Sequence, residues 1–180
     1  GITSHEDAQM ATSLGVDAIG FIFAPSPRQV SPDTAKEIIR TLPPFIQSVG
    51  VFVNEELSNL REIERFCCLD LIQLHGDEPS EMCKQLMPKS IKTIPIKDNA
   101  SLSRISEYIG CVRAILLDTY SKDLRGGTGK VFDWDLALEA KKYGVPVILS
   151  GGLNPFNVQY AIDAVRPLSL IHISEPTRPL

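Results

Sequence analysis

Stretches of consecutive apolar and often β-branched residues recur along the chain, separated by longer segments of mixed polarity. Six of these stretches are typical of strands buried on both faces of a sheet, at residues 17–23, 48–53, 69–75, 91–96, 113–118 and 145–150. The intervening segments contain helix-start signals at Thr3 with Glu6, at Ser31-Pro32 and at Asn154-Pro155. The pattern predicts an α/β protein in which every strand is followed by a helix.

The regular recurrence of βα units favours a parallel sheet with right-handed crossovers. A doubly wound open sheet fits the strand count equally well, but its dinucleotide signature, G-x-G-x-x-G after the first strand, is absent. Polar residues and glycines gather where the predicted strands end, at Arg28, Gln73 with His75, Asp118 and Gly151-Gly152. In a (βα)₈ TIM barrel these ends form one face, which carries the active site. We therefore expect a TIM barrel.

The expected barrel is incomplete, because only six whole βα units are visible. The chain begins directly with a helix start, which leaves no room for a strand ahead of the first helix. After the predicted helix 154–165, residues 168–180 have room for a short strand and a proline-broken tail. We expect the first strand and most of the eighth βα unit to be missing.

Composition and charge narrow the class of protein. A chain of 180 residues that is 43% apolar suits one domain with a real core. Its 18 basic and 22 acidic residues give a net charge of −4, which argues against a nucleic-acid partner. No apolar run approaches the ~20 residues needed to span a bilayer, and the start lacks signal-peptide features. We expect a cytoplasmic protein that binds neither membrane nor nucleic acid.

The four cysteines, at positions 67, 68, 83 and 111, show no metal-ligand spacing and no disulfide framework. We interpret them as reduced thiols.

Asp118 ends an apolar strand, where burial disfavours the charged carboxylate and suits a proton donor. A helix cap or a loop salt bridge is an equally good interpretation of its position. Arg28 lies in a proline-stiffened loop and could present its guanidinium fork to a carboxylate, although most surface arginines have no such role. His75 lacks companions at metal-ligand spacing, and we interpret it as a hydrogen-bonding residue of the active face.

Two glycine-rich segments suit an anion held by backbone N–H groups. Residues 126–129 precede Phe132-Asp133-Trp134, and residues 150–152 run from a strand end toward a helix start. Ordinary turn glycines are the alternative. Because the second segment lies late in the predicted barrel, where such folds bind phosphate, we favour phosphate binding.

Together these segments resemble the phosphoribosylanthranilate isomerase family of tryptophan biosynthesis. The resemblance covers residues 1–167 and rests on seven motifs in order, at 1–3, 20–23 with 26–28, 49–54, 73–76, 116–119, 126–129 with 132–134, and 149–155. It implies a TIM barrel and an Amadori rearrangement of the small phosphorylated substrate N-(5-phosphoribosyl)anthranilate to 1-(2-carboxyphenylamino)-1-deoxyribulose 5-phosphate, without metal or cofactor.

The resemblance also implies residue roles. Asp118, in the family's L-L-D-T motif, is the expected general acid, and Arg28 is expected to bind the anthranilate carboxylate. The other expected substrate-binding residues are Gln73, His75, Gly127, Gly129, Gly151 and Gly152.

The chain departs from the family at both ends. The family's general base is a cysteine in the pattern K-I-C-G-I-T, which would immediately precede Gly1. Residues 168–180 do not match the family, and we interpret them as an artefactual tail. A chain without the base is expected to be inactive, so a non-catalytic fragment with at most weak phosphate binding is the alternative function.

Two other barrel enzymes fit less well. A ribulose-phosphate epimerase needs several metal-binding histidines and aspartates at the strand ends, and an indole-glycerol-phosphate synthase needs lysines and glutamates there. The predicted strand ends carry His75 and Asp118 instead.

Overall fold

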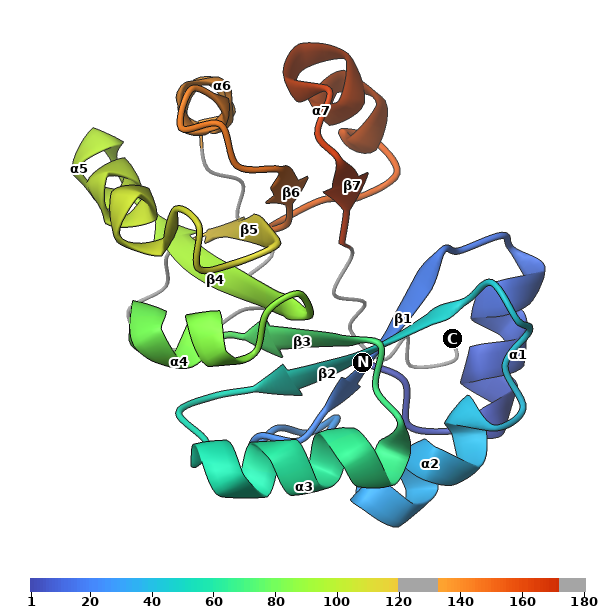
Figure 1. Cartoon of the computed structure of the whole chain (residues 1–180). Helices are drawn as coiled ribbons and strands as arrows, with labels where there is room; N and C mark the ends of the chain where they lie inside the picture. The colour runs from blue at the N-terminus through green and yellow to red at the C-terminus, as the bar shows by residue number, and fades with distance from the viewer. Residues whose placement is uncertain (120–132, 172–180) are drawn as a thin grey trace. The chain divides into compact units, whose positions relative to one another are not determined.

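Strands and helices alternate along the chain in the computed structural model, which describes residues 1–119 and 133–171 (Figure 1). The chain divides into two units, Gly1–Glu78 and Pro79–Leu180. All strand pairings within each unit are parallel, and each strand pairs with its neighbour in the sequence. The predicted parallel α/β class is therefore confirmed.

The first unit is a three-stranded parallel sheet with its helices. In chain order it contains α1 (His5–Ser13), β1 (Ala18–Ile22), α2 (Pro32–Ile39), β2 (Gln47–Phe52), α3 (Leu57–Cys67) and β3 (Leu71–Leu74). Strand β2 lies between β1 and β3, with Gly20 opposite Val49 and Val51 opposite Gln73. Figure 1 shows α2 and α3 side by side outside these strands.

The second unit has four strands in its described part. In chain order it contains α4 (Ser80–Gln85), β4 (Ser90–Ile96), α5 (Asn99–Leu102), the 3₁₀ helix η1 (Ser103–Tyr108), β5 (Ala114–Thr119), α6 (Asp135–Lys141), β6 (Val147–Leu149), α7 (Val158–Val165) and β7 (Ser169–Leu170). Pairing runs from β4 through β5 and β6 to β7. All six predicted strands are present across the two units, and the short strand expected after residue 168 is β7, where Leu170 lies opposite Leu149.

One predicted helix start is confirmed and two are shifted. The Ser31 side chain accepts a hydrogen bond from the N–H of Thr34, and Pro32 is the first residue of α2. The cap of α1 is Ser4, which accepts from the N–H of Asp7, so the capping box expected at Thr3 was wrong.

Helix α7 begins at Val158 and not at Asn154. The Asn154 side chain accepts a hydrogen bond from the N–H of Phe156, and the backbone N–H of Asn154 donates to Oδ1 of Asn157. These side-chain bonds compete with helical ones, so the Asn-Pro segment forms a turn ahead of the helix.

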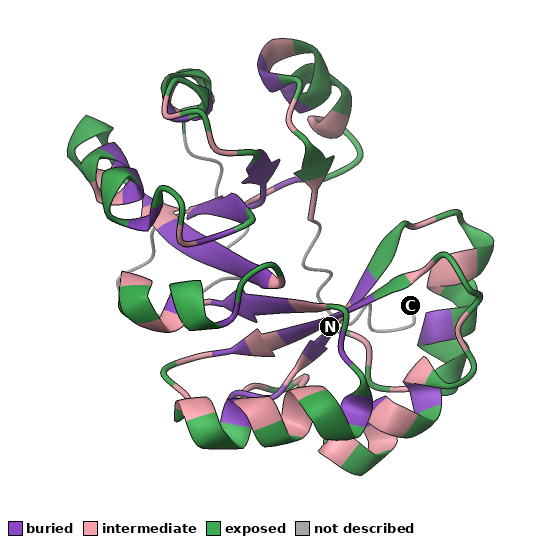
Figure 2. Cartoon of the chain, in the orientation of Figure 1, coloured by how far each residue is buried: buried purple, intermediate pink, exposed green. Residues whose placement is uncertain are grey.

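The strands are largely buried and the helices bury one side, as Figure 2 shows. In the first unit the rings of Phe23 and Phe52 stack with centroids 5.1 Å apart. Gly50 makes room for this pair, because a Cβ there would lie 2.8 Å from Phe52 Cε2 and 3.3 Å from Phe23 Cε2. Burial of each large apolar side chain contributes roughly 1.5–3 kcal/mol to stability.

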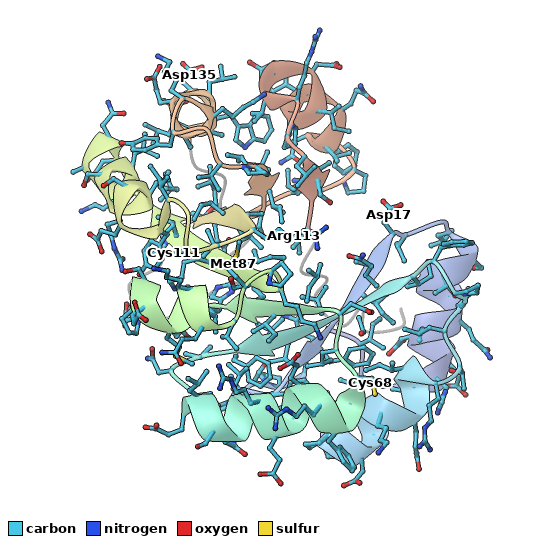
Figure 3. All side chains as sticks on the ribbon, viewed as in Figure 1. Asp17, Cys68, Met87, Cys111, Arg113 and Asp135 are labelled. Carbon is cyan, nitrogen blue, oxygen red and sulfur yellow. The ribbon has the colours of Figure 1, made fainter. Side chains whose placement is uncertain are left out.

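In the described ranges, no helix is both long enough and apolar enough to cross a membrane. All four cysteines fall within those ranges, and none is in a disulfide. Figure 3 shows Cys68 at the end of α3 and Cys111 in the segment leading into β5. Burial raises the pKa of the Cys67 thiol, which favours its protonated and unreactive form.

Candidate active site

Asp118 is the penultimate residue of β5, and its side chain is 3% exposed. The strand before it is wholly buried, and in the paired β4 strand Pro95 lies opposite. Its Oδ1 accepts a hydrogen bond from the N–H of Thr119 at 2.8 Å. The structure thus places a largely desolvated carboxyl group at the carboxyl end of a parallel strand, where such folds perform chemistry.

The turn after β6 packs directly on Asp118. The N–H of Ser150 donates to Leu117 O at 2.9 Å, and Gly151 follows in a left-handed conformation with φ of +83°. A Cβ at Gly151 would collide with Thr119 Oγ1 and lie 3.0 Å from Asp118 Oδ1. The structure therefore brings the predicted acid and a predicted substrate-binding glycine together in the second unit.

Two further features of this turn concern hydrogen bonding. Gly152 is also left-handed, with φ of +63°, and its carbonyl accepts from Nδ2 of Asn157 at 2.9 Å. The Ser150 hydroxyl is fully buried and has no hydrogen-bond partner within residues 1–119 and 133–171. Ser150 belongs to the predicted glycine-rich segment 150–152, whose expected role rests on backbone N–H groups and not on this hydroxyl. The motif supplied the signal, but only the structure shows that this oxygen is buried.

Gln73 and His75 lie at the end of β3. Residues two apart on a strand share a face, and Gln73 Nε2 lies 2.8 Å from His75 Nδ1. When the amide nitrogen donates, Nδ1 accepts and the ring proton is on Nε2. The Gln73 side chain is 6% exposed, so this pair is a sheltered polar group on one face of the first unit's sheet.

Arg28 lies in the loop after β1, which is tied to the strand end at several points. The Arg28 N–H donates to Ser26 Oγ at 3.2 Å, and the Val30 N–H donates to Ile22 O at 2.9 Å. Burial, and after it the positive charge of Arg28, lowers the pKa of the amine at Gly1 to about 6. The guanidinium therefore acts electrostatically at Gly1, whose neighbour Ile2 donates its N–H to Gly20 O of β1 at 2.8 Å.

The predicted site residues are divided between the two units. Arg28, Gln73 and His75 belong to the first unit, and Asp118, Gly151 and Gly152 belong to the second. The predicted residues Gly127 and Gly129 lie outside the described residues. Among the residues that are described, no group of three or more histidine, cysteine, aspartate or glutamate side chains is arranged to hold a metal ion.

Sequence reasoning overlooked Glu78, a buried carboxylate that joins the loops after β2 and β3. It is 2% exposed and accepts the N–H groups of Asn54 and Gly76. The available signal was an acidic residue two positions after Gly76, the glycine that ends the 73–76 motif.

Comparison with known proteins agrees with this arrangement. The family model of N-(5'phosphoribosyl)anthranilate (PRA) isomerase matches residues 1–173. The N-(5'-phosphoribosyl)anthranilate isomerase of Moorella thermoacetica is 49% identical over 94% of this chain and 76% of its own length, and that of Geobacter metallireducens is 49% identical over 94% and 83%.

Solved structures point the same way. Phosphoribosyl anthranilate isomerase from Thermotoga maritima superposes with a TM-score of 0.85 at 41% identity, covering 94% of this chain and 82% of that one. A phosphoribosyl anthranilate isomerase in complex with reduced 1-(o-carboxyphenylamino)-1-deoxyribulose 5-phosphate gives a TM-score of 0.81 at 40% identity, covering 94% and 81%. The chain belongs to the N-(5'-phosphoribosyl)anthranilate isomerase family, the isomerases of tryptophan biosynthesis.

Proposed function

We propose that Asp118 is the general acid of the isomerisation. The observation that carries this proposal is the position of its carboxyl group, buried at the end of β5 beneath the Gly151 turn. A carboxylic acid held at this strand end can act as a general acid and donate its proton to the furanose ring oxygen. The C–O bond of the ring then breaks, and the substrate opens to a Schiff base at C1′.

The second half of the reaction needs a base. It removes the proton from C2′ of the Schiff base to give an enolamine, which takes up a proton at C1′ and becomes the ketone. The family's cysteine would immediately precede Gly1. Because Gly1 lies against Ile22 and within the electrostatic reach of Arg28, that position adjoins the end of β1.

The remaining residues suit an anionic substrate. The fixed loop around Arg28 supports a guanidinium that pairs with the anthranilate carboxylate. The Gln73–His75 pair offers the ring's Nε2–H as a donor to the sugar. Gly127 and Gly129 are assigned to the substrate by motif alone. Gly151 and Gly152 are assigned to the phosphate, since two successive left-handed glycines expose backbone N–H groups.

For the fold, we propose that residues 1–167 belong to a (βα)₈ TIM barrel of which this chain carries part. The family model extends the match to residue 173, so the tail that we place outside the family is shorter than residues 168–180. The sequential parallel pairing within each unit and the TM-scores against family structures support this proposal. The substrate is a small phosphorylated molecule. The cytoplasm is the compartment that suits the four thiols, because it is a reducing environment.

Turnover of N-(5'-phosphoribosyl)anthranilate in D₂O tests the mechanism. The assay uses the chain preceded by the family's Lys-Ile-Cys segment and continued after residue 167 by the eighth βα unit of a family member, so that the proposed base and the expected barrel are both present. Loss of the C2′ proton and uptake of solvent deuterium at C1′ should give a product with one deuterium at C1′, detected by NMR. A product without deuterium at C1′ would contradict the enolamine route, and absence of product would contradict the isomerase assignment.

A further inference from the structure

The loops that follow β2 and β3 are tied together by two reciprocal side chains, Asn54 and Glu78. Glu78 Oε1 accepts the N–H of Asn54 at 2.8 Å, and both carboxylate oxygens accept the N–H of Gly76, at 3.0 and 2.9 Å. In return, Asn54 Oδ1 accepts the N–H of Asp77 at 2.7 Å. We refer to Asn54, Gly76, Asp77 and Glu78 as the loop clasp.

The clasp continues the hydrogen bonding of the sheet past the end of β3. The His75 N–H donates to Phe52 O at 2.8 Å, so three consecutive amides, at residues 75, 76 and 77, are each held. A segment in which every backbone N–H donates a hydrogen bond moves little, because each displacement would break a bond in a partly buried site. The backbone that carries the His75 ring is therefore fixed on both sides.

The structure of the clasp explains why a glycine stands at position 76 and an asparagine at position 54. A Cβ at Gly76 would collide with Asn54 Oδ1 and lie 2.7 Å from both Asn54 N and Glu78 Oε1. Asn54 has a φ of +51°, a conformation that asparagine tolerates better than most residues. The tight approach shows that Glu78 sits directly on the chain beside His75, with its carboxylate 2% exposed.

We propose that Glu78 and Asn54 are positioning residues for His75. By holding the backbone just beyond the ring, they keep Nδ1 against the Gln73 amide and leave Nε2–H as the donor presented to the substrate. This inference rests on the proposed substrate-binding role of His75 and Gln73. It adds two residues, Glu78 and Asn54, that affect substrate binding only through His75.

The test uses the full chain and two readouts. The ¹⁵N signals of the His75 ring, assigned with a His75→Asn variant, report the tautomer in the free protein. Calorimetry with reduced 1-(o-carboxyphenylamino)-1-deoxyribulose 5-phosphate reports the Kd. Glu78→Leu removes both acceptor oxygens, Glu78→Gln retains one, and Asn54→Gly keeps the left-handed backbone while removing the acceptor for Asp77. Glu55→Leu is the matched control, since the Glu55 carboxylate lies on the same loop and accepts the adjacent N–H of Glu56.

In Glu78→Leu we expect the His75 ring to lose its single Nε2–H signature. We expect the Kd to rise about tenfold, the lower end of the effect of losing a residue that orients a ligand-binding side chain. Glu78→Gln should recover part of both effects, and Glu55→Leu should match the parent. If Glu78→Leu does not fold, Asn54→Gly and Glu78→Gln are judged by the same two readouts.

An unchanged His75 signature in the folded clasp variants would overturn the positioning role, whatever the Kd. An altered signature with an unchanged Kd would uphold the positioning role and instead refute the proposed contribution of His75 to substrate binding. The two proposals therefore fail separately.

Discussion

The α-carbon of Gly151 lies against the carboxylate of Asp118. A Cβ at this position would stand 3.0 Å from Asp118 Oδ1 and 2.7 Å from Thr119 N. The φ of +83° also excludes most side chains on conformational grounds. Gly151 thus sets how closely the turn after β6 approaches the proposed acid, in addition to any contact with phosphate.

Gly151→Ala should therefore impair both stability and turnover. The methyl group must displace Thr119 or Asp118, and we expect kcat/KM to fall by about tenfold or more, since small displacements of catalytic groups are costly. Gly144→Ala is the matched control. Gly144 has a φ of +74°, and a Cβ there meets nothing within 4 Å. It should show the backbone penalty of about 1–2 kcal/mol in urea unfolding, with normal kcat/KM. Equal activity losses in the two variants would refute the steric role.

Asp118→Asn should keep the shape of the site and remove the transferable proton. In the chain preceded by Lys-Ile-Cys and completed with a family eighth βα unit, we expect kcat to fall by on the order of 10²-fold or more, as for loss of a general acid. Asp17→Asn is the control, because Asp17 is exposed just ahead of β1 (Figure 3). A near-normal kcat for Asp118→Asn would remove Asp118 from the mechanism.

Arg28→Ala should weaken binding of the anthranilate carboxylate. A charge-assisted hydrogen bond contributes roughly 1.5–3 kcal/mol, so the Kd for the reduced product analogue should rise accordingly, as measured by calorimetry. Arg28→Lys should restore only part of the affinity, because an ammonium cannot form the two-pronged contact. Unchanged affinity with an unchanged circular dichroism spectrum would show that Arg28 does not contact the ligand.

Asp70→Ala should lower stability while leaving ligand binding intact. Asp70 Oδ2 accepts both the N–H and the hydroxyl of Ser48, each at 2.8 Å, and Ser48 is fully buried. Leaving these buried donors unsatisfied costs about 1–3 kcal/mol in the free energy of unfolding. Both residues lie at the amino-terminal side of β2 and β3, away from Gln73 and His75, so a changed Kd for the product analogue would contradict this separation of roles.

Asp98 should make stability depend on pH in the acidic range. The side-chain and then the backbone hydrogen bond from Ser101 lower the pKa of Asp98 in the folded state. A lowered folded-state pKa gives a contribution that is complete above the ordinary value, about 4, and is lost as the pH falls through the lowered one. Urea unfolding of the parent and Asp98→Asn should thus differ at neutral pH and converge in acid. A pH-independent difference would contradict this origin.

Much of the local structure could be predicted because it depends on neighbouring residues. Continuous apolar runs produced all six expected strands, and Ser31-Pro32 began a helix as expected. The helix predicted from Asn154 failed at its start because asparagine side chains there bond to nearby backbone instead. Local signals compete within a few residues, and sequence alone does not show which bond forms.

The sequence by itself determined the alternation of strands and helices, the order of the polar strand ends and, through its motifs, the family. These features depend on side-chain periodicity and on residue types at fixed spacing, both of which can be read directly from the sequence. Only the tertiary structure decided that Gly151 lies against Asp118 and that Glu78 accepts the N–H of Asn54 from the loop after β2. Both contacts join loops from different strands, because parallel pairing places successive strand ends side by side while the intervening helices separate them in the sequence.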